Sequence, residues 1–297
     1  MRRRFLLIEN PRAGAGKSAL TAGCVAALVK RGASVERVMT EGPAHTREAA
    51  KDAANSELFD ALIVAGGDGT IRQAASGLLG RALPFGVIPA GTGNVLAAEL
   101  GLPHAPEALA DYLCGAKARA VTGGVANGEL FLFMAGVGLD AEIVARLHRP
   151  LARRFGKTAY APAILGALVA APRPRLAVRI GNKTISAEWV IVAKSSRFAG
   201  PFLLTRRAGL LKRGLQLVSV AAGWRLTDAM RLAVLPFGIM EHMPGVRIDP
   251  CTRAVIESDR PTPVQIDGDI CGTTPVLVVE APAPVNVIVP RGGPARA

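Results

Sequence analysis

Short apolar runs alternate with helical patterns through the first 119 residues of the chain. The apolar runs lie at residues 5–8, 35–39, 61–65 and 83–88. The helical patterns between and after them lie at residues 19–31, 46–54, 71–79 and 95–100. Strands that alternate with helices are typical of an α/β domain, so this part predicts a doubly wound parallel sheet.

The pattern changes near residue 120. An Asn127-Gly128 pair predicts a hairpin between strands at 121–125 and 128–134, and one long helical region is expected at 141–170. Short β-rich runs follow at residues 176–180, 188–192, 215–220, 246–248, 254–257, 264–266, 276–279 and 285–289. They predict an antiparallel β-sandwich. We therefore expect two domains, a nucleotide-binding domain at 1–119 and a β-rich domain for a lipid substrate at 120–297.

A glycine-rich turn, Gly66-Gly67-Asp68-Gly69-Thr70, joins the apolar run at 61–65 to the helical pattern after it. Glycines let the backbone approach phosphate oxygens, and the first amides of a helix point toward an anion. Asp68 places a carboxylate near such an anion, which favours a Mg²⁺ ion between the two. A glycine turn without a ligand is the alternative interpretation.

A second glycine turn, Pro89-Ala90-Gly91-Thr92-Gly93-Asn94, follows the run at 83–88. Ligands of open α/β sheets bind outside the carboxyl ends of the strands, so two such turns would line one crevice. The segment from Asn10 to Ser18 follows the first strand and resembles a phosphate-binding loop. It lacks the Walker spacing, because Pro11 stands where a glycine is required.

The formal net charge of +13 is uneven. Residues 1–119 contain 14 Lys/Arg against 11 Asp/Glu, whereas residues 120–297 contain 22 against 12. Such a field favours an anionic partner, and the few aromatic residues argue against nucleic acid. The basic positions Arg146, Arg149, Arg153, Arg154, Lys157, Arg173 and Arg175 flank an apolar segment at 159–171. This segment predicts contact with an anionic membrane surface, and a core helix with solvated basic ends is the alternative.

The four cysteines, Cys24, Cys114, Cys251 and Cys271, have no metal-binding or disulfide-scaffold spacing, which fits a reducing compartment. The longest apolar segment is interrupted by Pro162 and is too short to span a bilayer. We therefore expect a cytoplasmic protein that is peripheral to the inner face of the membrane.

The two glycine turns together resemble those of the diacylglycerol kinase catalytic-domain family, in its compact bacterial lipid kinase type. Further pieces occur in the order of that family: Asn10-Pro11, Thr40, the segment from Gly136 to Ala141, and Gln265-Ile266-Asp267-Gly268-Asp269. The resemblance implies an N-terminal nucleotide domain and a C-terminal β-sandwich. It also implies ATP-dependent phosphorylation of a hydroxyl of diacylglycerol or a related long-chain lipid, as in phospholipid biosynthesis.

Carried over by position, the resemblance assigns a nucleotide-binding set and a catalytic set. The nucleotide set is Asn10, Thr40, Gly66, Gly67, Asp68, Gly69, Thr70, Gly91 and Thr92, with Asp68 also on Mg²⁺. Asp267 and Asp269 would face the γ-phosphate, and one of them would deprotonate the acceptor hydroxyl, so the catalytic set is Asp68, Asp267 and Asp269. A carboxylate near the nucleophile is what phosphoryl transfer to an alcohol requires.

Two departures from the family pattern concern these sites. The family has Asp-Gly-Glu where this chain has Asp267-Gly268-Asp269, so the carboxylate of Asp269 is one methylene shorter. Arginines, notably Arg207 and Arg213, stand where bacterial relatives carry the aspartates of a second, structural Mg²⁺ site. A guanidinium cannot ligate Mg²⁺, so we expect that this metal site is lost and that a cation of the chain replaces its charge.

Two other functions remain open at this level. A catalytically weakened or inactive relative that binds lipid or nucleotide would explain both departures. An NAD kinase would share the first glycine turn, but this chain has no Asn-Glu pair for the substrate ribose, and that reading leaves the second turn without a role.

Overall fold

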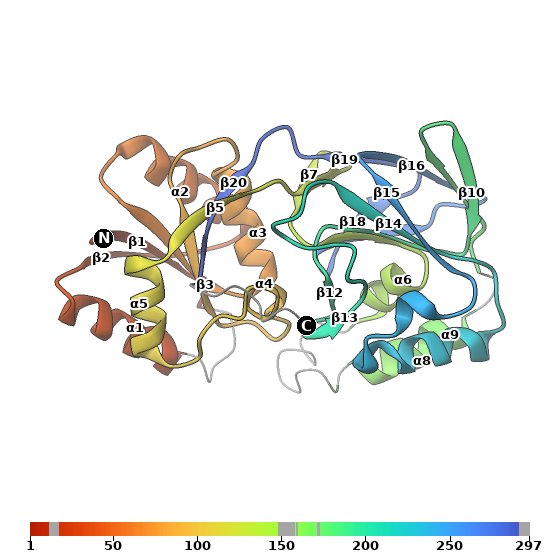
Figure 1. Ribbon diagram of the computed structural model, residues 1–297, viewed down its shortest axis with the longest axis horizontal. Coiled ribbons are helices and arrows are strands. Elements are labelled where there is room, and N and C mark those ends of the chain that lie inside the picture. Colours follow the sequence, from red (N-terminus) through yellow and green to blue (C-terminus); the bar gives the residue numbers. More distant parts are fainter. Residues whose placement is uncertain (12–17, 148–157, 159, 171–172, 291–297) are drawn as a thin grey trace. The chain divides into compact units, whose positions relative to one another are not determined.

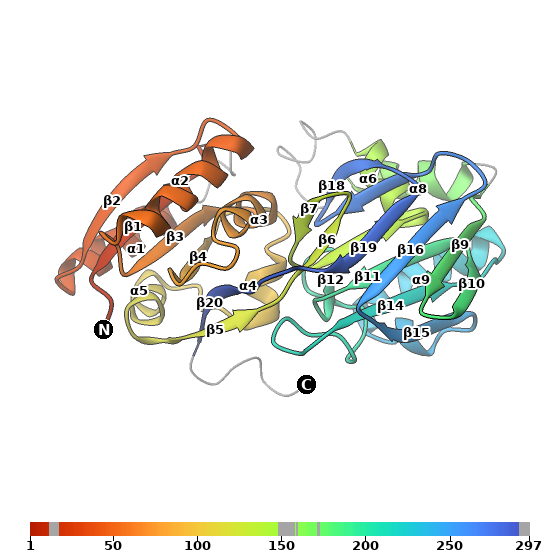
Figure 2. The ribbon, with the colours of Figure 1, turned by 90° about the horizontal axis from the view of Figure 1, so that it is seen from above.

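The computed structural model describes residues 1–11, 18–147, 158, 160–170 and 173–290 (Figure 1). The chain divides into two compact units, each of which is described by itself. The first consists of Met1–Val121 together with Pro282–Ala297, and the second is Thr122–Ala281. The elements of each unit are also visible from above in Figure 2.

The first unit is built on a six-stranded sheet with the strand order β2-β1-β3-β4-β20-β5. Its strands are β1 (Arg4–Glu9), β2 (Ser34–Met39), β3 (Ala61–Gly66), β4 (Phe85–Pro89), β5 (Lys117–Val121) and β20 (Val285–Val289). Neighbouring strands from β2 to β20 are parallel, and β5 is an antiparallel edge strand. Every residue of β3 is buried, as expected for a central strand of a sheet covered on both faces.

The helices of the first unit pack in two pairs, α1 with α5 and α2 with α3. They are α1 (Ser18–Lys30), α2 (Pro43–Ser56), α3 (Asp68–Gly77), α4 (Val95–Leu100) and α5 (Pro106–Gly115). Each of the predicted helices is present, and α5 was missed. Its signals were present in the sequence, since Pro106 occupies the first turn and Leu109 and Leu113 repeat on the buried face.

Strand β20 lies between β4 and β5 of the first sheet. The expected domain division placed residues 285–289 with the β-rich second domain, because their apolar run resembles the runs before it. The structure instead returns the chain to the first unit after Ala281. Likewise, Val121 ends β5 in the first sheet rather than beginning the predicted hairpin.

The second unit contains two six-stranded antiparallel sheets packed face to face, as the sequence predicted. One has the order β10-β9-β16-β19-β6-β7 and the other β15-β14-β11-β8-β17-β18. Buried residues of both sheets, among them Phe131, Val178, Val190 and Val264, form one core. The strands are β6 (Gly124–Ala126), β7 (Glu129–Phe131), β8 (Met134–Val137), β9 (Leu176–Ile180), β10 (Lys183–Ala187), β11 (Trp189–Ala193), β14 (Leu215–Val220), β15 (Val246–Cys251), β16 (Arg253–Ser258), β17 (Pro263–Ile266), β18 (Asp269–Thr273) and β19 (Val276–Glu280).

The helices of the second unit lie outside the two sheets. They are α6 (Leu139–Arg146), α8 (Tyr160–Val169), α9 (Arg225–Ala233) and the 3₁₀ turns η2 (Leu235–Phe237) and η3 (Met240–His242), and a short ribbon joins β12 (Arg197–Phe198) to β13 (Phe202–Leu203). The prediction of one helix over 141–170 was wrong, because α6 ends at Arg146 and Leu147 adopts an extended conformation. Arg149, Arg153, Arg154 and Lys157 lie outside the described residues.

Candidate active site

The first glycine turn connects β3 to the start of α3. A Cβ placed on Gly66 would lie 2.8 Å from the Cβ of Thr70, so no larger residue fits where the strand ends. The Thr70 hydroxyl oxygen accepts a hydrogen bond from Nδ2 of Asn10 at 3.0 Å. Asn10 follows β1, and its own amide donates to the carbonyl of Ala65. The turn is therefore joined to the end of the neighbouring strand.

The second glycine turn packs directly on the first. A Cβ on Gly91 would overlap Cα of Gly67, and a Cβ on Gly67 would lie 3.2 Å from Cα of Gly91. Asn94 closes the second turn, because its Oδ1 accepts from the Gly91 amide at 2.9 Å and its Nδ2 donates to the Gly91 carbonyl at 2.8 Å. Both turns thus need glycine so that their backbones can touch.

Asp68 joins the two turns through its carboxylate. Its oxygens accept from the amide of Val95, the first residue of α4, at 2.9 and 3.2 Å. A Cβ on Gly93 would lie 2.8 Å from Oδ2 of Asp68, so the second turn closes over this carboxylate. Asp68 therefore stabilises the N-terminus of α4.

Substituting Gly91 with Ala tests this contact between the turns. The added methyl would overlap the Gly67 backbone, and we expect Gly91→Ala to lower the free energy of unfolding by about 1–3 kcal/mol. Gly42→Ala is the matched control, because a Cβ there has nothing within 4 Å. Thermal denaturation measures both variants, and equal midpoints would contradict the packing described here.

The structure places the other predicted nucleotide residues at the same edge of the first sheet. Thr40 follows β2 and is buried, and its amide donates to the carbonyl of Glu9 at 2.9 Å. Gly69 lies in the first turn of α3, and Thr92 lies exposed in the second glycine turn. Because β1 to β4 are parallel, all these residues follow the carboxyl ends of neighbouring strands. The loop at 12–17 lies outside the described residues.

Asp267 occupies a tight turn between β17 and β18 in the second unit. Asp267 and Gly268 both have positive φ, 49° and 87°, which is typical of a two-residue hairpin turn. The Asp267 carboxylate accepts the amides of Leu132, Phe133 and Met134 at 2.8, 2.9 and 3.0 Å. Three donors on one carboxylate hold this turn against the segment between β7 and β8.

Asp269 follows in the same turn as the first residue of β18, opposite Ile266. Its side chain is partly exposed, unlike the strand residues before it. Both aspartates of the Asp267-Gly268-Asp269 motif are partly exposed, and Asp267 is the one bound by the amides of residues 132–134.

A buried hydrogen-bond network supports this turn from inside the second unit. Asp140 is 3% exposed and accepts from Nε1 of Trp189 at 3.0 Å and from Nε2 of Gln265 at 2.8 Å. Oε1 of Gln265 in turn accepts the Gly268 amide at 2.8 Å. Burial raises the pKa of Asp140 to about 6. Trp189 has no role among the sequence predictions, since its place beside Asp140 depends on long-range strand pairing.

The segment between Leu204 and Gly214, where relatives are expected to carry metal-binding aspartates, is held by lysines. Lys194 is 1% exposed, and its ammonium donates to the Lys212 carbonyl. The Lys212 ammonium donates to the carbonyl of Arg206. Among the described residues there is no cluster of three or more His, Cys, Asp or Glu that could hold a metal ion. A buried ammonium of the chain lies in the loop where the resemblance places a metal.

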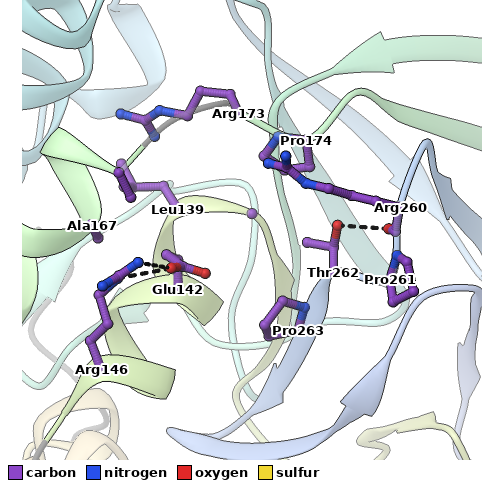
Figure 3. A pocket seen from close by; sticks show the side chains of 12 residues that line it. Leu139, Glu142, Arg146, Ala167, Arg173, Pro174, Arg260, Pro261, Thr262 and Pro263 are labelled. Carbon is purple, nitrogen blue, oxygen red and sulfur yellow. Dashed lines mark hydrogen bonds and ion pairs between the residues drawn. The ribbon is translucent and has the colours of Figure 1, made fainter.

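A cavity of about 220 Å³ lies in the second unit beside α6 and α8 (Figure 3). Glu142, Arg146, Arg173 and Arg260 are its charged lining residues. Arg146 forms an ion pair with Glu142 at 2.6 Å, and Arg173 forms one with Asp228 at 3.1 Å. Ligand pockets typically measure about 300–1,000 Å³, so this cavity is too small for both chains of a diacylglycerol.

Residues 4–126 match the family described as diacylglycerol kinase catalytic domain. The diacylglycerol kinase of Mycobacterium tuberculosis is 29% identical over 297 residues, which cover 96% of this chain and 95% of that protein. The diacylglycerol kinase of Bacillus subtilis is 40% identical over 115 residues, 38% of either chain. An uncharacterized protein of Synechocystis is 25% identical over 245 residues. The match covers 77% of this chain but only 54% of that relative.

Solved structures share the fold. A diacylglycerol kinase of Bacillus anthracis superposes with a TM-score of 0.73 at 18% identity and covers 98% of each chain. A second B. anthracis protein, described as a candidate for the same activity, has a TM-score of 0.80 at 20% identity over 98% of this chain and 96% of its own. The sequence matches confirm the predicted family: residues 4–126 of this chain match the diacylglycerol kinase catalytic domain.

Proposed function

We propose that the protein is a lipid kinase that transfers a phosphoryl group from ATP to a hydroxyl of diacylglycerol or a related long-chain lipid. The observation that carries this proposal is the pair of glycine turns, packed backbone to backbone at Gly67 and Gly91 and joined by Asp68. Related proteins described as diacylglycerol kinases support the same reaction class.

The glycine turns suit a nucleotide polyphosphate. Their glycines carry no side chains at the carboxyl ends of parallel strands, where phosphates bind in α/β sheets. Asn10, Thr40, Thr70 and Thr92 would bind the nucleotide around Gly66, Gly67, Gly69 and Gly91.

Asp68 supplies one carboxylate, which fits a Mg²⁺ ion that takes its remaining ligands from phosphates and water. Bound there, Mg²⁺ would neutralise phosphate charge. The chain's own part is to hold the Asp68 carboxylate in place through the Val95 amide.

The turn at Asp267-Gly268-Asp269 would supply the proton acceptor. Asp267 already accepts three backbone amides, so its role is to position the turn. Asp269, which is partly exposed like Asp267, is the carboxylate that would take the proton of the acceptor hydroxyl. Of the two aspartates that the sequence offered as the base, we therefore propose Asp269.

The acceptor lipid would be met at a membrane surface. We infer that the acyl chains stay in the bilayer while the hydroxyl reaches the enzyme. Among the described helices, none is long and apolar enough to cross a bilayer. Peripheral association with an anionic membrane therefore fits the basic second unit.

The direct test is transfer of labelled phosphate from Mg-ATP to lipids in mixed micelles. The panel contains diacylglycerol, monoacylglycerol, ceramide, sphingosine and phosphatidylglycerol. We expect label in one glycerolipid class, and we expect Asp68→Ala to reduce it at least a hundredfold, because the Mg²⁺ of Mg-ATP would lose its carboxylate ligand and the phosphate charge would lose its neutralising cation. Asp52→Ala, which removes an exposed carboxylate of α2, should leave transfer unchanged.

The outcome against this proposal is equally concrete. ATP binding without label in any lipid would identify a non-catalytic relative, for which the short Asp267-Gly268-Asp269 motif would be the structural reason. Asp269→Glu, which restores the longer side chain of the family pattern, would then be the variant to assay.

A further inference from the structure

Helix α9 is amphipathic, but it buries its charged side and exposes its apolar side. Its buried residues are charged, since Asp228 is 5% and Arg231 is 3% exposed. Its outward side carries Leu226 at 73% and Met230 at 52% exposed, four residues apart and thus on one side of the helix. A helix of a globular protein ordinarily buries its apolar face. The exposed apolar side of α9 therefore indicates a surface that contacts a partner or a membrane.

The buried charges of α9 are paired within the protein. Asp228 accepts from Nη1 of Arg231 at 2.9 Å and forms an ion pair with Arg173 at 3.1 Å. Arg231 also donates to the carbonyl of Pro244 at 2.8 Å. These contacts fix the helix with its apolar side outward.

Helix α8 also exposes large apolar side chains, and it buries small ones. Its small residues Ala163 and Ala167 are buried, and α8 packs on α6. Its larger residues Leu165 and Val169 are 63% and 59% exposed. Both helices therefore expose large apolar side chains to solvent, while Ile164, Leu168 and Leu232 are partly buried.

Helices α8 and α9 contact each other (Figure 1). Nη1 of Arg225 donates to the carbonyl of Val169 at 2.8 Å, which joins the start of α9 to the end of α8. Trp224 lies just before α9 at 85% exposed, and Phe237 in η2, which contacts α9, is 76% exposed. We call this surface the apolar face; it consists of Leu165, Val169, Trp224, Leu226, Met230 and Phe237.

Positive charge borders the apolar face. Residues 160–245 contain 12 Lys/Arg against three Asp/Glu. The exposed residues Arg206, Arg207 and Lys212 lie in the loop that Thr205 joins to Glu241 of η3 by a hydrogen bond of 2.6 Å. Arg225 is exposed between the two helices. Exposed tryptophan and phenylalanine bordered by arginine and lysine match the chemistry of an anionic bilayer surface.

We propose that the apolar face of α8, α9 and η2 inserts into the interface of an anionic phospholipid bilayer, with Trp224 and Phe237 as its deepest residues. The reason for membrane contact rests on the proposed lipid kinase function. The location of the contact rests on the exposed apolar side chains of α8 and α9. It assigns the membrane contact to residues 224–237 as well as to the apolar segment near 160–169 that the sequence indicated.

The chain provides its own reporter for the test. It has two tryptophans, and Trp189 is buried at 2% exposed while Trp224 is at 85%. On addition of vesicles of phosphatidylglycerol and phosphatidylcholine, we expect a blue shift of Trp224 emission and quenching by brominated acyl chains. Vesicles of phosphatidylcholine alone should bind weakly, and salt should weaken binding to the anionic vesicles.

Substitutions then localise the contact by vesicle sedimentation. The variant Trp224→Ser/Phe237→Ser should lower the partition coefficient at least tenfold, because two large apolar side chains leave the interface. Leu58→Ser, at a position 62% exposed in the first unit, is the matched control and should bind like the unsubstituted protein.

Three results would overturn the inference: binding that the double variant retains, equal binding to phosphatidylcholine vesicles, or a stable dimer that the double variant abolishes, which would show that a second copy covers the face. The assay needs no nucleotide. If the unsubstituted protein does not bind anionic vesicles but still transfers phosphate to micellar lipid, the docking surface alone is refuted. Vesicle binding without transfer would refute the kinase alone.

Discussion

Asp269→Asn should reduce phosphoryl transfer by about 10²- to 10⁴-fold while leaving the fold intact, because a general base contributes that much to a proton transfer. The side chain is partly exposed at the start of β18, so an amide of the same shape fits there without disturbing the core. Asp269→Glu keeps a carboxylate and should retain activity within about tenfold of the unsubstituted protein. Steady-state kinetics with the preferred lipid measures both variants.

Asp267→Asn is the contrasting variant. Its carboxylate accepts three backbone amides, and an amide side chain offers only one acceptor oxygen and points a donor at another donor. We expect a loss of about 1–3 kcal/mol in the free energy of unfolding, measured by denaturant titration. If Asp267→Asn instead lost turnover at unchanged stability while Asp269→Asn stayed active, the two roles would be reversed.

Asp140→Asn and Gln265→Glu should each destabilise the protein strongly, and together they should nearly cancel. In the native network the Gln265 amide donates to the Asp140 carboxylate, and the Gly268 amide donates to Gln265. Asp140→Asn sets donor against donor, and Gln265→Glu sets carboxylate against carboxylate. Each should cost about 1–3 kcal/mol or more, because a buried polar group loses its partner.

The double variant exchanges the two chemistries. The amide at position 140 can accept from Trp189 and donate to the carboxylate at position 265, which still accepts the Gly268 amide. We therefore expect the double variant to be more stable than the sum of the two single losses in the free energy of unfolding predicts. Denaturation of the four proteins of a double-mutant cycle measures this coupling energy. Turnover should follow the same order, because the network supports the turn that carries Asp269. Additive losses would show that the network does not act as a unit.

The pH dependence gives an independent check on Asp140. Burial raises the pKa of its carboxyl from an ordinary value of 3.8 to about 6 in the folded protein. Below about pH 4 the group is protonated in both states, and its contribution to stability is fully present. That contribution is lost as pH rises through 6, since the unfolded chain is then already ionised. Asp140→Asn should remove this part of the pH profile of stability.

The sequence predicted the layers of the fold because local patterns determine them. The run at 61–65 is apolar throughout, as a doubly covered strand must be, and the glycine turn after it has the spacing of a strand-to-helix connection. Asn127-Gly128 adopted the positive φ values that the hairpin requires. Where the chemistry of two or three adjacent residues decides the backbone, the prediction succeeded.

Long-range pairing decided the rest. Asp267 and Asp269 look alike in the sequence, because the amides of residues 132–134 that bind Asp267 lie far from it in the chain. Helix α9 was missed in the sequence, and its outward side could not be predicted, because Arg173 and Pro244, which bind Asp228 and Arg231, lie outside the helix. Strand β20 pairs with β4 and β5 across more than 150 residues, a distance at which no local pattern acts.

The return of β20 sets an order of events for the newly made chain. Strand β20 separates β4 from β5, and it is synthesised after every strand of the second unit. Until then the first unit has an open gap in its sheet, while the intervening second unit already has all of its strands. The first unit therefore cannot close its sheet before the second unit has been made, so a chain truncated before Val285 would keep this gap between β4 and β5.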